Sequence, residues 1–195
     1  MNPFQQHTGK VVAYDMPNVD TDQIIPARFL KKIDRVGFGE LLFHDLRFET
    51  DGTPKPGFVL DEPRYAGATI LVSGPQFGIG SSREHAPWAI QQFGFKAVIS
   101  PSFGDIFRNN CYQNGLLPVQ LKDSDVSTII ARSQEIENYQ LSVDLETQTV
   151  TDSLGLSATF EIEAFRKDTL LRGLDDIGLT LEHEDDISKF EKARA

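Results

Sequence analysis

Two consecutive strand–helix–strand units constrain the fold of this chain more than any other feature. Short, β-branched apolar runs at 68–73 and 97–100 have the composition of buried strands, and residues 83–93 between them carry apolar side chains at helical spacing. The pattern repeats from 97–100 through 104–114 to a further apolar run at 116–121. Parallel strands need a long crossover connection, which is usually a helix. The sequence therefore predicts an α/β domain with parallel β-α-β units at its centre.

Other segments add elements around this centre. Apolar periodicity predicts three more strands, at 11–14, 140–145 and 157–165. In the last two of these, apolar and polar residues alternate as in half-buried antiparallel strands. Helical spacing predicts two more helices, at 123–134 and 164–172. Asp123 or Ser124 is available to cap the first, and Gly94, Gly115 and Gly173 are placed to end three of the helices.

Two segments stand apart from this pattern. Residues 49–67 contain three prolines and three glycines without a clear period, which predicts a long surface loop and no second domain. Residues from about 183 to 195 are rich in acidic side chains and predict a terminal helix or tail. We therefore expect one domain over residues 1–195, a length sufficient for a full hydrophobic core.

Composition excludes several functions. The net charge of −10 disfavours a general nucleic-acid or anionic-membrane binder, because both need a positive face. The single cysteine, Cys111, can form neither an internal disulfide nor a multi-cysteine metal site. The first residues match neither a secretion signal nor a transit peptide, and no apolar run approaches membrane-spanning length. We expect a cytoplasmic protein.

The run FGIGSSREHAPW at 77–88 concentrates residues that bind anions and turn the chain. It lacks the lysine of a phosphate loop, the third glycine of a dinucleotide fingerprint and the flanking glycines of a hydrolase nucleophile elbow. Ser81 and Glu84 have the spacing of a helix capping box, which is the structural alternative. Hydroxyls beside the guanidinium of Arg83 instead suggest a site for an anion.

The same run resembles the signature of the swivelling domain of the aconitase superfamily. Its continuation through HAPWA and FGFK resembles the small subunits of bacterial 3-isopropylmalate dehydratase. Further segments resemble that family in the same order: VDTDQIIPARFL at 19–30, RVGFGELLFHDLRF at 35–48, SPSFGDIFRNNCYQNGLLPV at 100–119 and GLDDIGLTLEHEDDI at 173–187. The resemblance covers nearly the whole chain. It implies a single three-layer β/β/α swivelling domain and the interconversion of 2-isopropylmalate and 3-isopropylmalate, by loss and re-addition of water, in leucine biosynthesis.

The resemblance also implies roles for particular residues. Ser81 would be the catalytic base, and Ser82 and Arg83 would hold a substrate carboxylate. A helix N-terminus next to Ser81 would help to stabilise its alkoxide. Thr21 and Asp22 match a threonine–aspartate pair in which the aspartate lies at the edge of the active site. A local turn is the structural alternative for this pair, and we favour it for Thr21.

Supporting and second binding positions follow from the same comparison. Support of the active site is expected from five residues: Asp22, Gly78, Gly80, Glu84 and His85. The glycines would let backbone amides face inward, and Glu84 and His85 would lock the turn by hydrogen bonds. Arg35 lies near the place of a second substrate arginine, with Arg28 and Arg47 as competing candidates.

Substrate choice would depend on the segment that follows Arg35. The specificity loop is expected at Val36, Gly37, Phe38 and Gly39, because its glycines and apolar residues suit an isopropyl group better than a third carboxylate. The structural alternative is a place in the hydrophobic core, which we expect for at least two of Phe38, Leu41, Leu42 and Phe43.

The resemblance implies a partner as well. The [4Fe-4S] cluster of the family needs three cysteines, so no cofactor or metal is expected on this chain and the cluster is expected on a large subunit. Rival interpretations are a related dehydratase for citramalate or methylmalate and a stand-alone module that binds an anion without chemistry. An RNA-binding role, known elsewhere in the superfamily, is disfavoured by the acidic charge.

Overall fold

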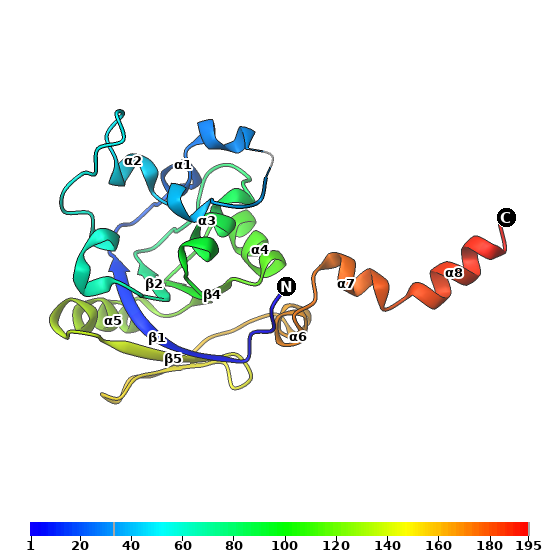
Figure 1. Cartoon of the computed structure of the whole chain (residues 1–195). Helices are drawn as coiled ribbons and strands as arrows, with labels where there is room; N and C mark the ends of the chain where they lie inside the picture. The colour runs from blue at the N-terminus through cyan, green and yellow to red at the C-terminus, as the bar shows by residue number, and fades with distance from the viewer. Residues whose placement is uncertain (33, 195) are drawn as a thin grey trace.

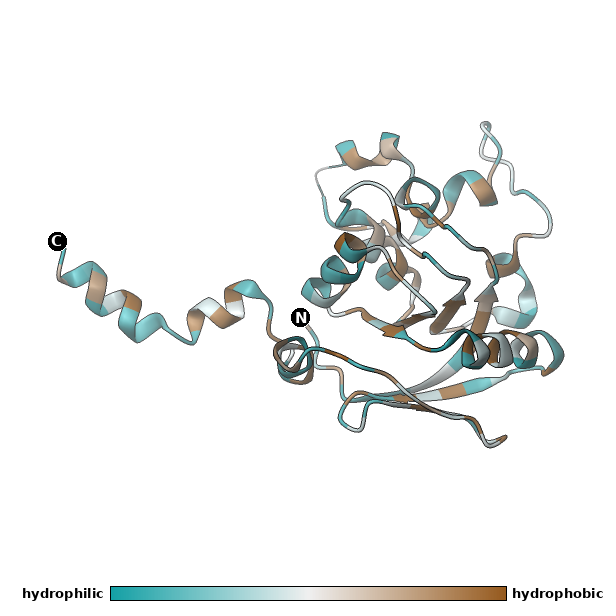
Figure 2. Ribbon diagram, turned by 180° about the vertical axis from the view of Figure 1, so that it is seen from behind, coloured by the Kyte–Doolittle hydropathy of each residue, from teal (hydrophilic) through white to brown (hydrophobic). Residues whose placement is uncertain are grey.

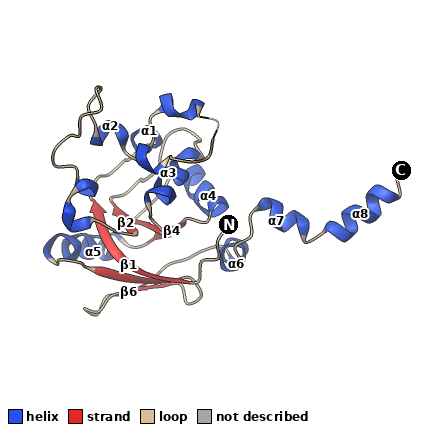
Figure 3. Ribbon diagram, viewed as in Figure 1, coloured by secondary structure: helices blue, strands red, loops and turns tan. Residues whose placement is uncertain are grey.

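Residues 1–32 and 34–194 are described by the computed structural model, and within them seven strands form one curled sheet, ordered β4–β3–β2–β1–β5–β6–β7 (Figure 1; Figure 3). The strands are β1 (Gln6–Tyr14), β2 (Ile70–Ser73), β3 (Ala97–Ser100), β4 (Leu117–Gln120), β5 (Gln140–Asp144), β6 (Thr149–Thr151) and β7 (Ser157–Thr159). Strands β1 to β4 pair in parallel, and β5 to β7 pair antiparallel with their neighbours. The predicted parallel centre and antiparallel flank are confirmed.

Strand β1 belongs to both halves of this sheet. Its last four residues, from Val11, pair in parallel with β2, whereas its first five, up to Lys10, pair antiparallel with β5. Gly9 lies next to this change of partner, and a Cβ atom there would come within 1.9 Å of the Thr69 Oγ1 atom. A larger residue at position 9 would therefore have to displace the Thr69 and His7 side chains.

Helices connect and cover the sheet. The α-helices are α1 (Thr21–Ile24), α2 (His44–Arg47), α3 (His85–Phe93), α4 (Asp105–Asn114), α5 (Asp123–Glu135), α6 (Ala164–Arg172), α7 (Asp176–Leu181) and α8 (Glu184–Lys192). The short 3-10 helices are η1 (Ala27–Lys31), η2 (Gly39–Leu41), η3 (Val59–Asp61) and η4 (Pro63–Tyr65). The predicted glycine stops are confirmed, because Gly94, Gly115 and Gly173 form C-caps with positive φ.

Side chains of β2 alternate between two hydrophobic cores. Ile70 and Val72 face a core that the parallel strands share with β5, β6, β7 and α5. Leu71 faces the opposite core, which it shares with α3 and α4. Figure 2 shows apolar residues along the strands at the centre of the body. The layers are therefore antiparallel strands, parallel strands and helices, and the predicted β/β/α arrangement is confirmed.

The capping box that was the structural alternative for Ser81 and Glu84 does not form at the start of α3. The helix begins at His85, the N-cap position is Glu84, and no side chain caps it. The reason is that Glu84 has a distant partner: the Asn114 Nδ2 group donates to Glu84 Oε1 (3.1 Å). A start at His85 also places Pro87 in the first turn, where the missing N–H of proline is tolerated.

Other local predictions need correction. Helix α5 starts one residue earlier than its predicted caps allow, at an N-cap Lys122 without a side-chain bond. Asp123 and Ser124 lie in its first turn instead, where the acidic side chain interacts favourably with the helix dipole. Strand β7 ends at Thr159 and does not extend to 165. Strand β6 and helix α7 were not predicted, because both are short.

Residues 49–67 are more ordered than a surface loop. They contain η3 and η4, and two of their side chains, Leu60 and Tyr65, are buried in the core beneath α3. The Tyr65 hydroxyl donates to the Ser133 carbonyl of α5 (3.3 Å). This segment therefore packs against β1 and α5.

The chain ends in an arm that leaves the body of the domain (Figure 1). It consists of α7 and α8, and the predicted acidic terminal helix is confirmed in α8. Four large apolar side chains of the arm are exposed: Ile177, Leu181, Ile187 and Phe190. Ala195, the last residue of the predicted tail, lies outside the described residues. No helix in the described part of the chain is both long and apolar enough to span a membrane.

Candidate active site

The segment GIGSSRE belongs to a loop, residues 74–84, that follows the carboxyl end of β2. Two neighbouring loops hold it in place. The Gly78 N–H donates to the Val19 carbonyl (2.7 Å) after β1, and the Phe77 N–H donates to the Ser102 carbonyl (3.0 Å) after β3. The carboxyl ends of three parallel strands thus gather their loops at one edge, which is where open α/β sheets bind ligands.

Two glycines set the course of this loop. Gly78 has a φ of 75°, and a Cβ atom there would lie 2.2 Å from Cγ of Phe107. Gly80 has a φ of 100° with ordinary space around it, so its backbone conformation alone requires glycine. Beyond this turn, Ser81 and Ser82 are exposed to solvent. This geometry fits the supporting role expected of both glycines.

The surroundings of Ser81 differ from those expected. Helix α3 begins at His85, so Ser81 does not lie at the helix N-terminus that was expected to stabilise its alkoxide. A buried side chain from α1 lies beside it instead. The Thr21 Oγ1 donates to the Ser81 carbonyl (3.0 Å) and lies 3.4 Å from the Ser81 Oγ atom. Sequence reasoning placed Thr21 in a local turn and missed this contact.

Arg83 and Asp22 come together across the same loop. The Arg83 Nη2 group donates to Asp22 Oδ2 (2.8 Å), and Nη1 donates to Oδ1 and to the Ile25 carbonyl (3.2 Å). The hydrogen bonds from Arg83 lower the pKa of the Asp22 carboxyl group. The Arg83 side chain is only 11% exposed, whereas that of Asp22 is 57% exposed. The Arg83 guanidinium thus binds the Asp22 carboxylate through two nitrogens. It could bind a carboxylate of a substrate in the same way.

Glu84 and His85 are tied to the helices behind the loop. Asn114, at the end of α4, donates to Glu84 and accepts from the Trp88 Nε1 group (2.7 Å). The His85 ring packs against the rings of Phe38 and Trp88, with centroids 5.4 Å and 4.7 Å away. Burial lowers the pKa of His85, and the positive charges nearby add to the shift, whereas Glu84 opposes it. These contacts fit the structural role expected of both residues.

Arg35 packs against a side chain of α3. Its Cζ atom is 4.6 Å from the centroid of the Trp88 ring, and its guanidinium has no carboxylate partner among the described residues. Arg35 and Glu84 line a common cavity of about 420 Å³ with Asn110 and Asn114. The structure therefore brings Arg35 and Glu84 to one cavity next to the start of α3.

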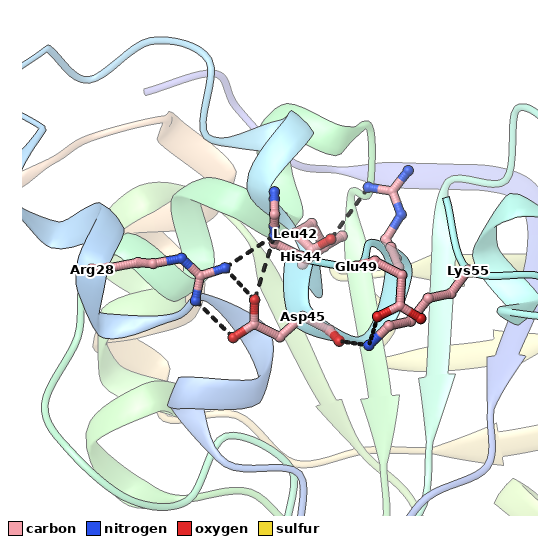
Figure 4. A network of polar contacts seen from close by, with 7 residues as sticks. Arg28, Leu42, His44, Asp45, Glu49 and Lys55 are labelled. Atoms are coloured by element: carbon pink, nitrogen blue, oxygen red, sulfur yellow. Dashed lines mark hydrogen bonds and ion pairs between the residues drawn. The ribbon is translucent and has the colours of Figure 1, made fainter. Parts of the chain in front are cut away.

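The two competing arginines are already paired. Arg28 of η1 contacts both oxygens of Asp45 on α2 and lies 3.2 Å from His44 Nδ1 (Figure 4). Arg47 pairs with Asp61 (2.6 Å). Arg28 also lines a larger cavity, of about 770 Å³, which, like the cavity that Arg35 lines, contains neither Ser81 nor Arg83. Of the three arginines, Arg35 has the guanidinium that is available to a ligand.

The expected specificity loop divides into an outer and an inner part. Val36 is 75% exposed, and Gly37 has a positive φ of 80°. Phe38 is fully buried, as the core alternative predicts, and so are Leu42 and Phe43. Gly39 packs so closely on α3 that a Cβ atom would lie 2.6 Å from the backbone of Gln92. Within this segment Val36 has the exposed large side chain that could contact a ligand.

The described residues offer no place for an iron–sulfur cluster. Residues 1–32 and 34–194 contain no group of three or more His, Cys, Asp or Glu side chains that could hold a metal ion. Cys111 is fully buried in the core, and burial raises the pKa of its thiol well above the ordinary value. A thiol that stays protonated is a poor metal ligand.

Comparisons with known proteins agree with the resemblance found in the sequence. The family model described as Aconitase C-terminal domain matches residues 1–124, and LeuD_N matches 128–164. The model for the C-terminal domain of the 3-isopropylmalate dehydratase small subunit matches 176–195. Proteins called 3-isopropylmalate dehydratase small subunit from Brevibacillus brevis and Koribacter versatilis are 52% and 54% identical to this chain, with 100% of each chain covered. The chain belongs to the 3-isopropylmalate dehydratase small-subunit family.

A solved structure has a similar fold. The 3-isopropylmalate dehydratase from Methanocaldococcus jannaschii is 24% identical, with 94% of this chain and 98% of that chain covered, and superposes with a TM-score of 0.67. This likeness supports the three-layer fold described above.

Proposed function

We propose that this chain is the small subunit of a 3-isopropylmalate dehydratase, a hydro-lyase of leucine biosynthesis. The enzyme would interconvert 2-isopropylmalate and 3-isopropylmalate through isopropylmaleate. The observation that carries the proposal is identity of about 50% over the full length with several proteins of that name. A biosynthetic enzyme whose one cysteine is a buried free thiol fits the reducing cytoplasm.

The geometry of the loop suits the first half of this reaction. Dehydration removes a weakly acidic proton beside a carboxylate, so the site needs a base and a group that holds the carboxylate. In the proposal Ser81 is the base, because its hydroxyl is exposed at the ligand-binding edge of the sheet. Ser82 and Arg83 lie next to it in sequence and would bind the carboxylate, the guanidinium offering two parallel N–H groups.

The substrate has a second carboxylate and an isopropyl group. Arg35 would bind the second carboxylate, because its guanidinium is exposed and not paired with a carboxylate of the described chain. The exposed Val36 would contact the isopropyl group, with Gly37 giving the loop its turn. The same arrangement would accept a related acid such as citramalate less well, because its smaller side chain makes fewer apolar contacts.

The departing hydroxide needs a Lewis acid such as a metal ion. The described residues of this chain include no group of side chains that could hold one. We expect a [4Fe-4S] cluster on a large subunit to supply it when the two chains assemble. The exposed loop edge with Ser81 would then face that subunit, and the active site would be completed at the interface. Nucleic acid and membrane play no part in this proposal.

The proposal is tested by assembling the enzyme from separate chains. This chain and a candidate large subunit are purified anaerobically and assayed alone and together with 2-isopropylmalate and with citramalate. We expect each chain alone to be inactive and the pair to turn over isopropylmalate. Turnover by this chain alone after removal of metals would contradict the two-subunit proposal. Activity of the pair with citramalate only would assign the chain to the related dehydratase.

A further inference from the structure

The proposed base lacks support from its own segment. Ser81 is exposed, lies in a loop, and is separated by three residues from the first residue of α3. The position of a base must match the productive geometry to within about 0.5 Å. Something outside the loop must therefore fix the position of Ser81.

Thr21 is the side chain that reaches Ser81 from another element. Its hydroxyl donates to the Ser81 carbonyl at 3.0 Å, and the same oxygen lies 3.4 Å from Ser81 Oγ. A hydroxyl has one proton and two acceptor positions. In this arrangement the hydroxyl proton of Thr21 bonds to the Ser81 carbonyl, and the hydroxyl oxygen of Thr21 faces the Ser81 side chain.

Thr21 is itself rigidly placed. It is 1% exposed, its N–H donates to the Ile79 carbonyl (2.9 Å), and its carbonyl accepts from the Ile25 N–H (3.0 Å). It is the first residue of α1, which begins with a capping box between Asp20 and Gln23. Thr21 thus links a capped helix to both ends of the turn that carries Ser81.

We propose that Thr21 is the positioning residue of Ser81, an inference that rests on the proposed function of Ser81 as base. In that step the substrate C–H bond breaks, its electron pair passes toward the adjacent carboxylate, and the proton forms an O–H bond with the Ser81 alkoxide. The Thr21 oxygen lies 3.4 Å from Ser81 Oγ, so the Thr21 hydroxyl can turn from the Ser81 carbonyl to donate to that alkoxide, and such charge-assisted bonds are short and strong. Thr21 touches no substrate and acts only through Ser81.

The test uses the assembled two-chain enzyme and the variants Thr21→Val and Thr21→Ser. Valine keeps the shape of threonine without its hydroxyl, and serine keeps the hydroxyl. We expect Thr21→Val to lower turnover about 10- to 100-fold with little change in KM, as for a misplaced catalytic group. Thr21→Ser should restore turnover to within about 3-fold, since a single hydrogen bond is retained. Thr169→Val is the matched control, because Thr169 is also buried and donates to a carbonyl (2.9 Å) far along the chain in α6.

Two further measurements separate positioning from a general structural effect. Introduced into a Ser81→Ala enzyme, Thr21→Val should cause almost no additional loss, because residues that act as one unit are not additive. In the full chain without its partner, Thr21→Val should speed amide hydrogen exchange around residues 79–82 while thermal unfolding shifts no more than in the Thr169→Val control.

The outcomes distinguish this inference from the proposed function. Full turnover by Ser81→Ala would remove Ser81 as the base and the proposed mechanism with it. A large loss in Ser81→Ala together with full turnover in Thr21→Val would overturn the positioning role alone. An equal loss from Thr21→Val in the wild-type and Ser81→Ala backgrounds would also overturn it, because Thr21 would then act independently of Ser81.

Discussion

The Arg83 guanidinium faces the Asp22 carboxylate with both of its terminal nitrogens, although the two residues are 61 positions apart. In the proposed function the same two N–H groups bind a carboxylate of the substrate. Asp22 therefore competes with the substrate for Arg83, or moves aside when the substrate arrives. Because Arg83 lowers the pKa of Asp22, the pair is intact at neutral pH and is lost only as the pH falls below the ordinary carboxyl range.

Replacing Asp22 by Asn should relieve this competition. We expect Asp22→Asn to lower the KM for isopropylmalate about 2- to 5-fold, because the free energy of a half-exposed ion pair corresponds to a factor of that size. Asp45→Asn is the matched control, since it breaks the Arg28 pair elsewhere and should leave KM unchanged. Steady-state kinetics of both variants decide the matter. A higher KM in Asp22→Asn would mean that the pair holds Arg83 in its binding position.

The two serines of the loop should differ in their effects. Ser81→Ala should fold, join the large subunit and bind substrate, yet lose turnover by about 10²- to 10⁴-fold, as for a positioned general base. Ser82→Ala should be milder and should act mainly on KM. Turnover per assembled site and thermal unfolding are measured on the same preparations. If Ser82→Ala loses more turnover than Ser81→Ala, the roles are assigned the wrong way round.

Arg35 should prove to be the second carboxylate ligand. We expect Arg35→Gln to raise KM about 10-fold or more, because a hydrogen bond to a charged group is lost. Arg28→Gln, which removes a paired arginine, should leave the kinetic constants nearly unchanged. The reverse order of effects would move the second binding position to the larger cavity that Arg28 lines.

Substitution of Val36 should change substrate specificity, whereas substitution of Phe38 should change stability. Val36→Ser should lower kcat/KM for isopropylmalate more than kcat/KM for citramalate, by a difference that corresponds to about 1 to 3 kcal/mol. The free energy of unfolding should hardly change. Phe38→Ala should destabilise the fold by about 3–5 kcal/mol, because it empties a fully buried position. Denaturant unfolding and the ratio of the two kcat/KM values measure these effects. Equal losses for both acids in Val36→Ser would show that Val36 does not contact the isopropyl group.

His85 should make stability depend on pH in the mildly acidic range. Burial lowers the pKa of its folded state, so the unfolded chain binds a proton more readily below about pH 6.5. The free energy of unfolding should therefore fall as the pH drops from about 7 toward 5. In His85→Gln this slope should be smaller. His7, whose pKa is also lowered, contributes to the slope that remains, and His7→Gln is the control; carboxylates with lowered pKa values, such as Asp22, add to that slope near pH 5. Equal slopes in the wild type and His85→Gln would contradict the assignment.

The order of strands and helices could largely be predicted from the sequence. The runs at 68–73 and 97–100 are continuously apolar because both faces of β2 and β3 are buried, and glycines end the helices that follow. Strand β6 was missed because it has three residues, of which only Val150 is buried. A strand so short is defined by its pairing with β5 and β7, which no local pattern contains.

The candidate site could be predicted in its composition but not in its contacts. Ser81 and Glu84 have the spacing of a capping box, yet each has a partner far away in sequence: Thr21 for Ser81 and Asn114 for Glu84. These partners set the start of α3 at His85. Local spacing cannot reveal such contacts, because they depend on how separate loops meet at the edge of the sheet.

Strand β1 meets its two partners at very different times during translation. Its residues 11–14 can pair with β2 once residue 73 has left the ribosome, whereas residues 6–10 must wait for residues 140–144. Until then the first half of β1 is an open strand edge, free to pair with another chain. A nascent chain that stalls or is cleaved before residue 140 would therefore be prone to aggregate, and chaperones that cover this edge would raise the yield of folded protein.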